Sequence, residues 1–259
     1  MGAPPAATVT IVIVVLGEGA AGDGSRSLAL ALRRLGEAVA LGALDPRAPK
    51  SDDFVTLPCT MASGDGVADL LDRAQTDGDP VHAVVLASVG VPTTEHGELA
   101  ALDPTQWADR VEIPLRRTLA CFQGSHRRLR ARGGCLLVLV PTLSLVGAAG
   151  MAPWAAVAEA QRALAKSAGR AWGHEGITVN CVAVPAALLV TALRAPGAVA
   201  GGVPGTAGPD RPGLPPPSLD RSPSWESDIA PVVASLAAPG WTGVTGATIA
   251  VDGGVWMTP

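Results

Sequence analysis

A glycine-rich turn follows the first apolar run of the chain, and its residue types could hold a phosphate group. The turn reads GEGAAGDG and places glycines at Gly17, Gly19, Gly22 and Gly24. Glycine lets a backbone approach a ligand closely, and the amino end of a following helix attracts negative charge. However, Glu18 and Asp23 put two carboxylates in the same turn, and these would repel a phosphate. The pattern therefore favours a turn that needs glycine for its conformation, with dinucleotide binding as the second interpretation.

Side chains suited to proton transfer or nucleophilic attack are sparse. The chain has four histidines, four cysteines and no tyrosine. The cysteines lie in or beside apolar runs without a Cys-x-x-Cys pair, at Cys59, Cys121, Cys135 and Cys181. We therefore predict buried reduced thiols and no metal site.

Composition narrows the classes of partner and location. Apolar residues make up 48% of the 259 and charged residues 16%, with a net charge of −4, so a large core is expected and general disorder is not. The basic run HRRLRAR, residues 126–132, is typical of a solvated helix end, and we expect no nucleic-acid partner. The first apolar run is too short to span a membrane and lacks the basic start of a secretory signal, which predicts a cytoplasmic protein. The 17 Arg against 2 Lys indicate a GC-rich bacterial source.

Buried strands alternating with helices must position these residues. Continuous apolar runs predict strands, and apolar stripes of helical period predict helices. Strands are expected at 8–16, 38–44, 81–90, 133–144, 176–184 and 246–254, and helices at 27–38, 66–75, 103–131, 152–172 and 224–238. Asp103 is the predicted N-cap of the long central helix.

This alternation predicts an α/β fold: a Rossmann-like, doubly wound parallel sheet in three α/β/α layers. We expect a single domain over residues 1–259, because the chain shows neither repeats nor a second core. A segment rich in Gly and Pro, residues 195–217, cannot form a regular helix and is expected as an excursion over the carboxyl edge of the sheet.

Three further stretches make the chain resemble the short-chain dehydrogenase/reductase family over nearly its whole length. GITVNCVAV, residues 176–184, resembles the strand that follows the active-site helix of that family. TGVTGATIAVDGG, residues 242–254, is similar to the family's carboxyl-terminal signature, and SLALALRRLGEAVAL to the helix and strand after its cofactor loop.

The resemblance implies a dinucleotide held on a TGxxxGxG loop, and here that loop departs from the pattern. Counting back from Gly36 keeps Gly19 but puts Asp23 and Ser25 at the second and third glycines. A shift of one residue recovers Gly22 and Gly24. The family's NNAG stretch becomes ASVG, residues 87–90. Asp45 could bind a ribose or could simply form a turn. We predict no cofactor, or NAD(P) bound only weakly.

The same alignment implies that the catalytic residues of the family are replaced. Its tyrosine falls on Trp154, its lysine on Ala158 and its serine on Pro141 or Thr142. An indole does not exchange a proton near neutral pH, and alanine carries no charge to lower a neighbouring pKa. The asparagine of the central helix falls on Pro114, where we expect a kink. No catalytic residue is therefore expected.

The chain lacks the catalytic residues of the family but keeps its helices, strands and carboxyl-terminal signature. This combination predicts a non-catalytic or structural subunit. The resemblance implies association through the long helices, residues 104–132 and 152–173, and through the carboxyl-terminal segment 225–259. The expected partner is an active relative of the 3-oxoacyl-[acyl-carrier-protein] reductase kind, as in heteromeric ketoreductases, within a bacterial secondary-metabolite pathway. The same partner surface could instead join identical copies.

Two alternatives stay open at this stage. The first is an enzyme with non-redox chemistry, a cyclase, dehydratase or isomerase acting on a polyketide-like or aromatic substrate. Its cleft would be lined by Thr142, Ser144 and Trp154, but Glu159, His174 and Glu175 are the few acid/base groups nearby. The second is a regulator that binds a dinucleotide without converting it.

Overall fold

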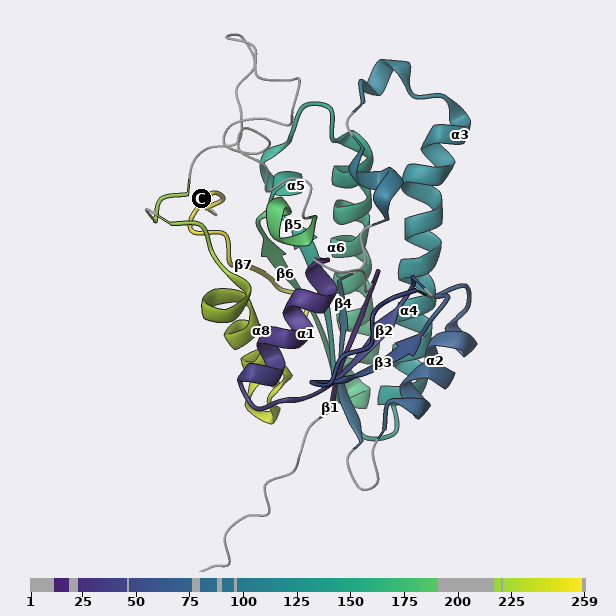
Figure 1. The fold of residues 1–259 in the computed structure, drawn as a ribbon, viewed down its shortest axis with the longest axis vertical. Coiled ribbons are helices and arrows are strands. Elements are labelled where there is room, and N and C mark those ends of the chain that lie inside the picture. The colour runs from purple at the N-terminus through teal and green to yellow at the C-terminus, as the bar shows by residue number, and fades with distance from the viewer. Residues whose placement is uncertain are drawn as a thin grey trace, which may run out of the picture.

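The computed structural model describes residues 12–18, 23–45, 47–75, 80–87, 90–95, 97–190, 217–219 and 221–257. Seven parallel strands form one sheet in the order β3-β2-β1-β4-β5-β6-β7. Helices cover both faces of this sheet (Figure 1). The predicted doubly wound fold is therefore confirmed, whereas most of the segment 195–217 lies outside the described residues.

The strands match the expected apolar runs. They are β1 (Val12–Gly17), β2 (Ala38–Ala43), β3 (Val55–Pro58), β4 (Val81–Leu86), β5 (Gly134–Pro141), β6 (Ile177–Val184) and β7 (Thr248–Ala250). β1 and β5 are buried along their whole length, as continuous apolar runs require when both faces of a sheet are covered. β3 was not predicted, because its residues are largely exposed and show no apolar run.

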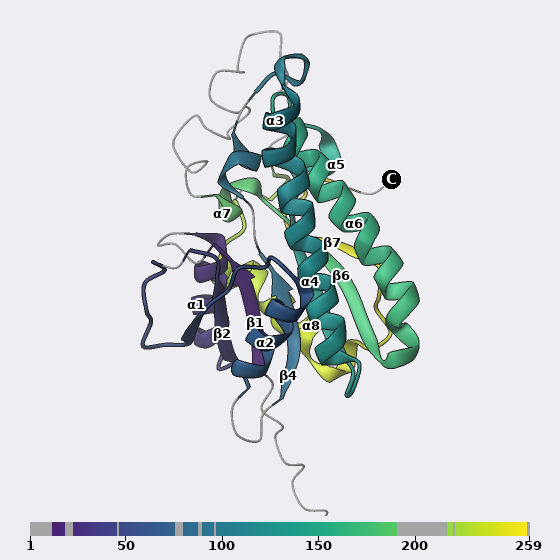
Figure 2. The same cartoon turned by 90° about the vertical axis from the view of Figure 1, so that its right-hand side faces the viewer.

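Two helical layers enclose the sheet (Figure 2). On one face lie α1 (Gly24–Arg34), α8 (Ala230–Ala237) and the short π-helix η6 (Trp225–Ile229). On the other lie α2 (Gly64–Arg73), α4 (Ile113–Leu129) and α6 (Ala152–Trp172). The short elements are α3 (Pro104–Trp107), α5 (Leu143–Val146), α7 (Ala186–Leu189), η1 (Val91–Thr94), η2 (Leu99–Ala101), the π-helix η3 (Ala108–Glu112), η4 (Gly173–Glu175) and η7 (Pro239–Trp241).

Each face of the sheet carries its own apolar core. One cluster joins β-strand side chains to α1 and α8, and the other joins them to α2, α4 and α6. α1 ends as predicted near Gly36, whose φ of +91° suits glycine. The four cysteines are all buried, as predicted.

Two of the three stretches that carry the family resemblance, residues 176–184 and 242–254, are joined by one buried amide. Asn180 of β6 donates from Nδ2 to the carbonyl of Val244 at 2.7 Å and accepts from the N–H of Ala247 at 3.0 Å. Asp252 is buried and accepts hydrogen bonds from the backbone N–H groups of Gly254 and Trp256, at 2.9 and 3.1 Å. The VDGG stretch therefore has a structural role that explains its presence without catalysis.

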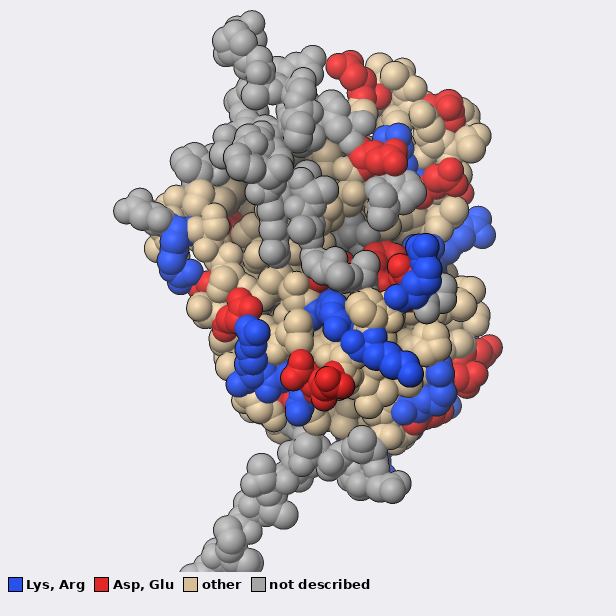
Figure 3. Space-filling view, viewed as in Figure 1, with Lys and Arg blue, Asp and Glu red and all other residues tan. Residues whose placement is uncertain are grey.

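Charges of both signs are interspersed over the face on which α1 lies (Figure 3). In the run 126–132, His126 pairs with Glu175, Arg127 with Asp65, and Arg128 with Asp72. Most of this basic run is thus neutralised locally, which agrees with a helix end. None of the helices within the described part of the chain is both long and apolar enough to cross a bilayer.

Candidate functional site

The carboxyl edge of the sheet is where a doubly wound fold places its ligands. The strand order reverses between β1 and β4, which are neighbours although they are not consecutive in the chain. A crevice outside the ends of those two strands is the usual ligand position in such sheets. The residues that follow β1, β4 and β5 therefore form the candidate site.

Two of the predicted glycines, Gly17 and Gly24, are required by packing. A Cβ on Gly17 would overlap the side chain of Ser25, so α1 begins directly against the end of β1. A Cβ on Gly24 would lie 3.0 Å from the carbonyl oxygen of Leu188 and 3.0 Å from Cα of Leu189, because α7 crosses the first turn of α1. Both glycines therefore serve close backbone contact. Gly19 and Gly22 lie outside the described residues.

The amino end of α1 is capped from within the chain. The carboxylate of Asp23 accepts a hydrogen bond from the N–H of Ser25 at 3.2 Å and another from the hydroxyl of Ser25. A negative side chain at this position satisfies free N–H groups and suits the helix dipole. A pyrophosphate would need the same amides and would face the same carboxylate.

An ion pair lies across the crevice between β1 and β4. Glu18, directly after β1, is 3.9 Å from the guanidinium of Arg117 on α4. Arg117 also lies beneath the turn after β4, since a Cβ on Gly90 would come within 3.9 Å of its Nη1. Ser88 and Val89, the middle of the expected ASVG stretch, lie outside the described residues. With Asp23, these residues do not fit a dinucleotide pyrophosphate, because two carboxylates lie where phosphate charge would be received.

Asp45, the candidate ribose ligand, is a turn residue. Its carboxylate accepts from the N–H of Arg47 at 2.8 Å and lies 3.3 Å from the guanidinium of Arg47. The backbone N–H and the guanidinium of Arg47 lower the pKa of Asp45. The carboxylate is therefore engaged locally.

The predicted catalytic positions after β5 are packed inside the protein. Pro141 is the last residue of β5, and the next residue, Thr142, is only 2% exposed. The hydroxyl of Thr142 has no hydrogen-bond partner among the described residues, and a buried polar group without one is costly. Ser144 uses its own hydroxyl to donate to the carbonyl of Pro141 at 3.1 Å.

Trp154 and Ala158, at the expected tyrosine and lysine positions, are core residues. Trp154 is 2% exposed and belongs to the apolar cluster that contains Leu143 and Val184. Ala158 is fully buried in the cluster on the opposite face, with Val140 and Cys181. The expected cleft residues Thr142, Ser144 and Trp154 thus lie close together in the fold, but the first and last are enclosed by packing.

Pro114 lies where the central helix changes its hydrogen-bonding pattern. The π-helix η3 ends at Glu112, and Pro114, where a kink was predicted, is the second residue of α4. The carbonyl of Pro114 accepts from Thr118 Oγ1 at 3.0 Å, and Thr118 Oγ1 accepts from Gln161 Nε2 at 2.9 Å. This buried chain joins α4 to α6. Sequence reasoning missed Thr118 and Gln161, because their partners are far apart along the chain.

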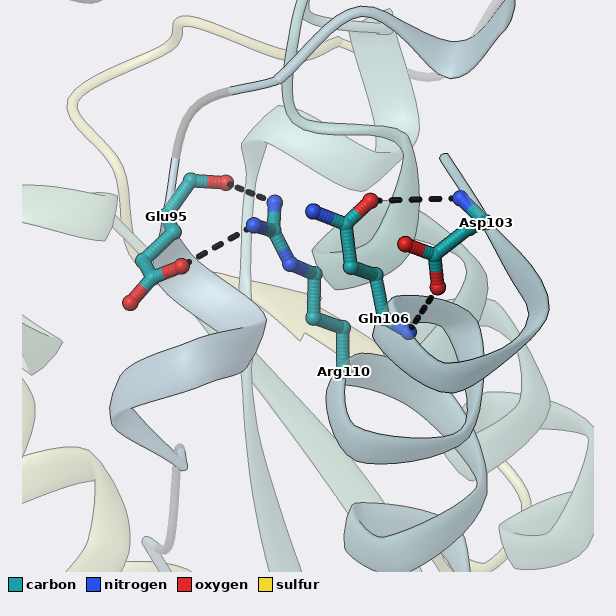
Figure 4. Close-up of polar contacts among 4 residues, drawn as sticks. All are labelled: Glu95, Asp103, Gln106 and Arg110. Atoms are coloured by element: carbon teal, nitrogen blue, oxygen red, sulfur yellow. Dashed lines mark hydrogen bonds and ion pairs between the residues drawn. The ribbon is translucent and has the colours of Figure 1, made fainter. Parts of the chain in front are cut away.

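A polar network fixes the segment between β4 and α4 beside this site (Figure 4). Asp103 caps α3 as predicted and forms a capping box with Gln106. One turn later, Arg110 of η3 pairs with the carboxylate of Glu95 at 3.0 Å. Gly97 donates its N–H to the carbonyl of Gly150, directly before α6. The network holds the loop after β4 against the helices on either side.

The remaining acid/base candidates are engaged elsewhere. Glu159 pairs with Arg162, and Glu175 pairs with His126 at 3.0 Å. The His174 side chain is 76% exposed. The ion pairs of Glu159 and Glu175 thus involve neither Thr142 nor Trp154.

Neither the thiols nor the acids form a reactive centre in the described residues. Burial raises the pKa of Cys121, Cys135 and Cys181 to about 12. Because the thiolate is the reactive form, these thiols are inert near neutral pH. No group of three His, Cys, Asp or Glu side chains within the described ranges is arranged to hold a metal ion.

Comparison with known proteins gives consistent relatives. The family model described as enoyl-(acyl carrier protein) reductase matches residues 24–201. The chain is 26% identical over 247 residues to the 3-oxoacyl-[acyl-carrier-protein] reductase FabG of Staphylococcus epidermidis, covering 90% of this chain and 94% of that protein. It is 28% identical over 170 residues to the (2S)-[(R)-hydroxy(phenyl)methyl]succinyl-CoA dehydrogenase subunit BbsD of Thauera aromatica, covering 61% and 66%.

Solved structures agree on the fold. An oxidoreductase of the short chain dehydrogenase/reductase family from Burkholderia thailandensis has a TM-score of 0.74 at 18% identity, covering 96% of this chain and 93% of its own. A 3-ketoacyl-(acyl-carrier-protein) reductase from Brucella melitensis, complexed with NADH, has a TM-score of 0.73 at 14% identity, covering 95% and 98%.

Proposed function

From the premise that this chain belongs to the short-chain dehydrogenase/reductase family, we propose that it is a non-catalytic subunit that associates with an active oxidoreductase of the same family. The partner is of the 3-oxoacyl-[acyl-carrier-protein] reductase type, within a bacterial biosynthetic pathway. The role of this chain is to supply a partner surface, and it transfers neither hydride nor proton.

The burial of Trp154 and Ala158 carries the proposal. Proton transfer needs a titratable group within hydrogen-bond reach of the substrate. Position 154 holds a 2%-exposed indole, and position 158 holds a methyl group without any exposure. Both residues are packed into separate cores, so these two positions supply no acid/base pair.

The crevice between β1 and β4, where a dinucleotide would bind, also supports a non-catalytic role. Glu18 pairs with Arg117 across the crevice, and Asp23 caps α1, so phosphate charge would have to displace two carboxylates. The relative from Brucella melitensis is described as complexed with NADH. For this chain we propose that NAD(P) is absent from the functional complex or binds weakly.

The outer surfaces of α4 and α6 supply the proposed interface. α6 turns Ala156, Ala160, Ala163, Ser167 and Ala171 away from its core-facing side, and the last three are exposed. Small side chains let two helices approach closely. On α4, Ile113 is 43% exposed and Leu119 48% exposed. The segment 225–259 is the second proposed contact. The relative BbsD is by name a subunit of a dehydrogenase, which is consistent with assembly.

Co-expression tests the proposal. A tagged copy of this chain is expressed with the adjacent reading frame of its genome that retains Tyr-x-x-x-Lys, and the two are purified through the tag. We expect the relative to co-purify in a fixed ratio and to hold all ketone-reducing activity, so that removing its tyrosine abolishes turnover. A chain that assembles only with itself, in the presence of that relative, contradicts the proposal.

A non-redox enzyme is the second candidate, and one observation favours it. The unpartnered hydroxyl of Thr142 could donate to a carbonyl that entered the site. Entry would require Trp154 to leave its core position, because both residues are buried.

A dinucleotide-binding regulator is the third candidate. Calorimetry with NAD(H) and NADP(H) tests it, and the absence of heat for all four removes it.

A further inference from the structure

A cavity of about 370 Å³ lies at the opposite edge of the sheet from the candidate site. It is bounded by the amino ends of β4, β5 and β6 and by the segments that follow α4 and α8. Its volume falls within the range of about 300–1,000 Å³ typical of small-molecule sites. Its apolar lining residues belong to the segment 225–259, which is also the second proposed contact with a partner.

One wall of the cavity is cationic. Arg130 and Arg132, from the end of the basic run 126–132, both line it. His126, Arg127 and Arg128 of the same run are paired with acids, but no ion pair joins the guanidinium of Arg130 or Arg132 to any other described residue. The two uncompensated cations of the run therefore border one cavity.

Another part of the lining is apolar. Leu236 at the end of α8 and Ala238, Pro239 and Trp241 around η7 contribute to it. Trp241 is 46% exposed, so its indole is accessible to a ligand. Two arginines and an exposed indole on one cavity suit a ligand with a charged end and an apolar body.

Part of the cavity lining is backbone without side chains, at two glycines that lie close to neighbouring segments of the chain. Gly133 and Gly134 have φ values of +74° and +142°. A Cβ on Gly133 would come within 2.8 Å of the carbonyl oxygen of Gly176, and one on Gly134 would clash with the carbonyl of His82. No side chain therefore rises from this part of the lining.

The other titratable groups of the described lining leave it with a positive charge. Glu175 is the one carboxylate among the described lining residues and offsets one of the two arginines, and its oxygens are 3.0 and 3.1 Å from Nε2 of His126. Burial lowers the pKa of His82, so its imidazole is neutral at neutral pH. Burial also raises the pKa of Cys135 to about 12, so no thiolate opposes an anion.

We propose that this cavity binds a small amphipathic carboxylate, with the carboxylate on Arg130 and Arg132 and the apolar body against Trp241 and Leu236. Arginine suits a carboxylate because its planar group donates two parallel hydrogen bonds. The indole and the leucine supply apolar area that an inorganic anion cannot use.

Titration of the full chain with phenylacetate tests this site. The readout is the indole ¹H–¹⁵N signal of Trp241, assigned with Trp241→Phe. We expect a saturable shift with phenylacetate that weakens as salt is added, and none with the uncharged isostere phenylacetamide. The double variant Arg130→Gln/Arg132→Gln should raise the dissociation constant by about tenfold or more. Arg127→Gln, in the same run but paired with Asp65, should change it by less than about twofold.

Several outcomes would overturn the proposal. One is the absence of a saturable shift up to about 10 mM phenylacetate, which corresponds to negligible affinity. Others are equal binding of phenylacetamide, equal binding of inorganic phosphate, or unchanged affinity in the double arginine variant. Thermal unfolding of each variant confirms that the fold is retained, since both arginines are exposed.

Discussion

Trp154 and Ala158, at the positions where the family resemblance implies a tyrosine and a lysine, are structural residues in this protein. The indole now fills space in one core and the alanine methyl lies in the other. A buried indole contributes to stability through its large apolar area. Both residues therefore contribute to the stability of the fold, and a tyrosine and a lysine at these positions should destabilise it.

The double variant Trp154→Tyr/Ala158→Lys tests that conclusion. We expect no oxidation of NADH or NADPH in the presence of a ketone, because Pro114, Pro141 and the carboxylates of the glycine-rich turn remain. We also expect the free energy of unfolding to fall by more than about 2 kcal/mol, because an ammonium at position 158 would lose its hydration. Nucleotide absorbance and urea unfolding measure the two effects.

The matched control is Ala171→Lys, on the exposed side of the same helix. It should change the free energy of unfolding by less than about 0.5 kcal/mol. Ketone reduction by the double variant would show that only two side chains separate this chain from an enzyme, and the subunit proposal would lose its main support.

At the residue scale, the sequence predicted on which element a residue lies better than it predicted which side chains that residue contacts. The spacing from Gly176 placed Trp154 and Ala158 on the helix where the structure has them, whereas Gly24, expected in the glycine-rich turn, is the first residue of α1. The pairs Glu18–Arg117 and Thr118–Gln161 were not predicted, since each joins residues from separate elements. Such contacts depend on how helices pack, which a single sequence does not specify.

At the element scale, two π-helices share one cause. η3 ends two residues before Pro114, and η6 ends two residues before Pro231. Proline has no N–H, so it cannot donate to the carbonyl four residues earlier, and the preceding turn widens. The sequence predicted a kink at Pro114, whereas the segment 224–238 was expected to be one helix. The effect of Pro231 on the hydrogen bonds of the turn before it was not predicted.

The start of η6 is held by a charged pair whose strength depends on pH. Arg221 donates to both oxygens of Asp228, at 2.8 and 2.6 Å, and the N–H of Ser224 donates at 2.8 Å. The hydrogen bonds from Arg221 and then from Ser224 lower the pKa of Asp228 from 3.8 to about 2. The folded state thus binds a proton less readily than the unfolded state does.

Stability should therefore change with pH in a defined direction. The contribution of Asp228 is fully present above the unfolded-state pKa of 3.8 and is lost as the pH falls through about 2. Asp228→Asn should lower the melting temperature at pH 5, and the difference from the unsubstituted chain should shrink toward pH 2. Asp52→Asn, an exposed carboxylate elsewhere, serves as control. A difference that stays constant from pH 5 to pH 2 would show that the carboxylate acts through packing alone.

At the scale of the whole molecule, the sequence specified the architecture because its apolar pattern is strong. Continuous runs identified the five buried strands β1, β2, β4, β5 and β6, the carboxyl-terminal stretch identified the short β7, and the alternation with helices predicted the doubly wound order. The edge strand β3 was not predicted from the sequence, because its half-exposed residues give a weak apolar pattern. The outer surfaces remained the least predictable part, since apolar periodicity does not distinguish a helix covered by its own sheet from one that also meets a partner.

The surface that α4 and α6 present to the outside is where the subunit proposal can be tested. Charged residues normally occupy the solvent side of a helix, but here Ala163 is exposed on α6 and Leu119 on α4. Arginine at position 163 would separate two closely packed helices, and arginine at 119 would bury an unpaired charge in the interface. We expect Ala163→Arg and Leu119→Arg each to raise the dissociation constant of the complex by about tenfold or more, measured by analytical ultracentrifugation. Leu99→Arg alters a side chain that is 63% exposed and lies on neither helix, so it should leave assembly unchanged. If all three variants assemble equally well, the interface lies elsewhere, and the carboxyl-terminal segment 225–259 becomes the surface to alter next.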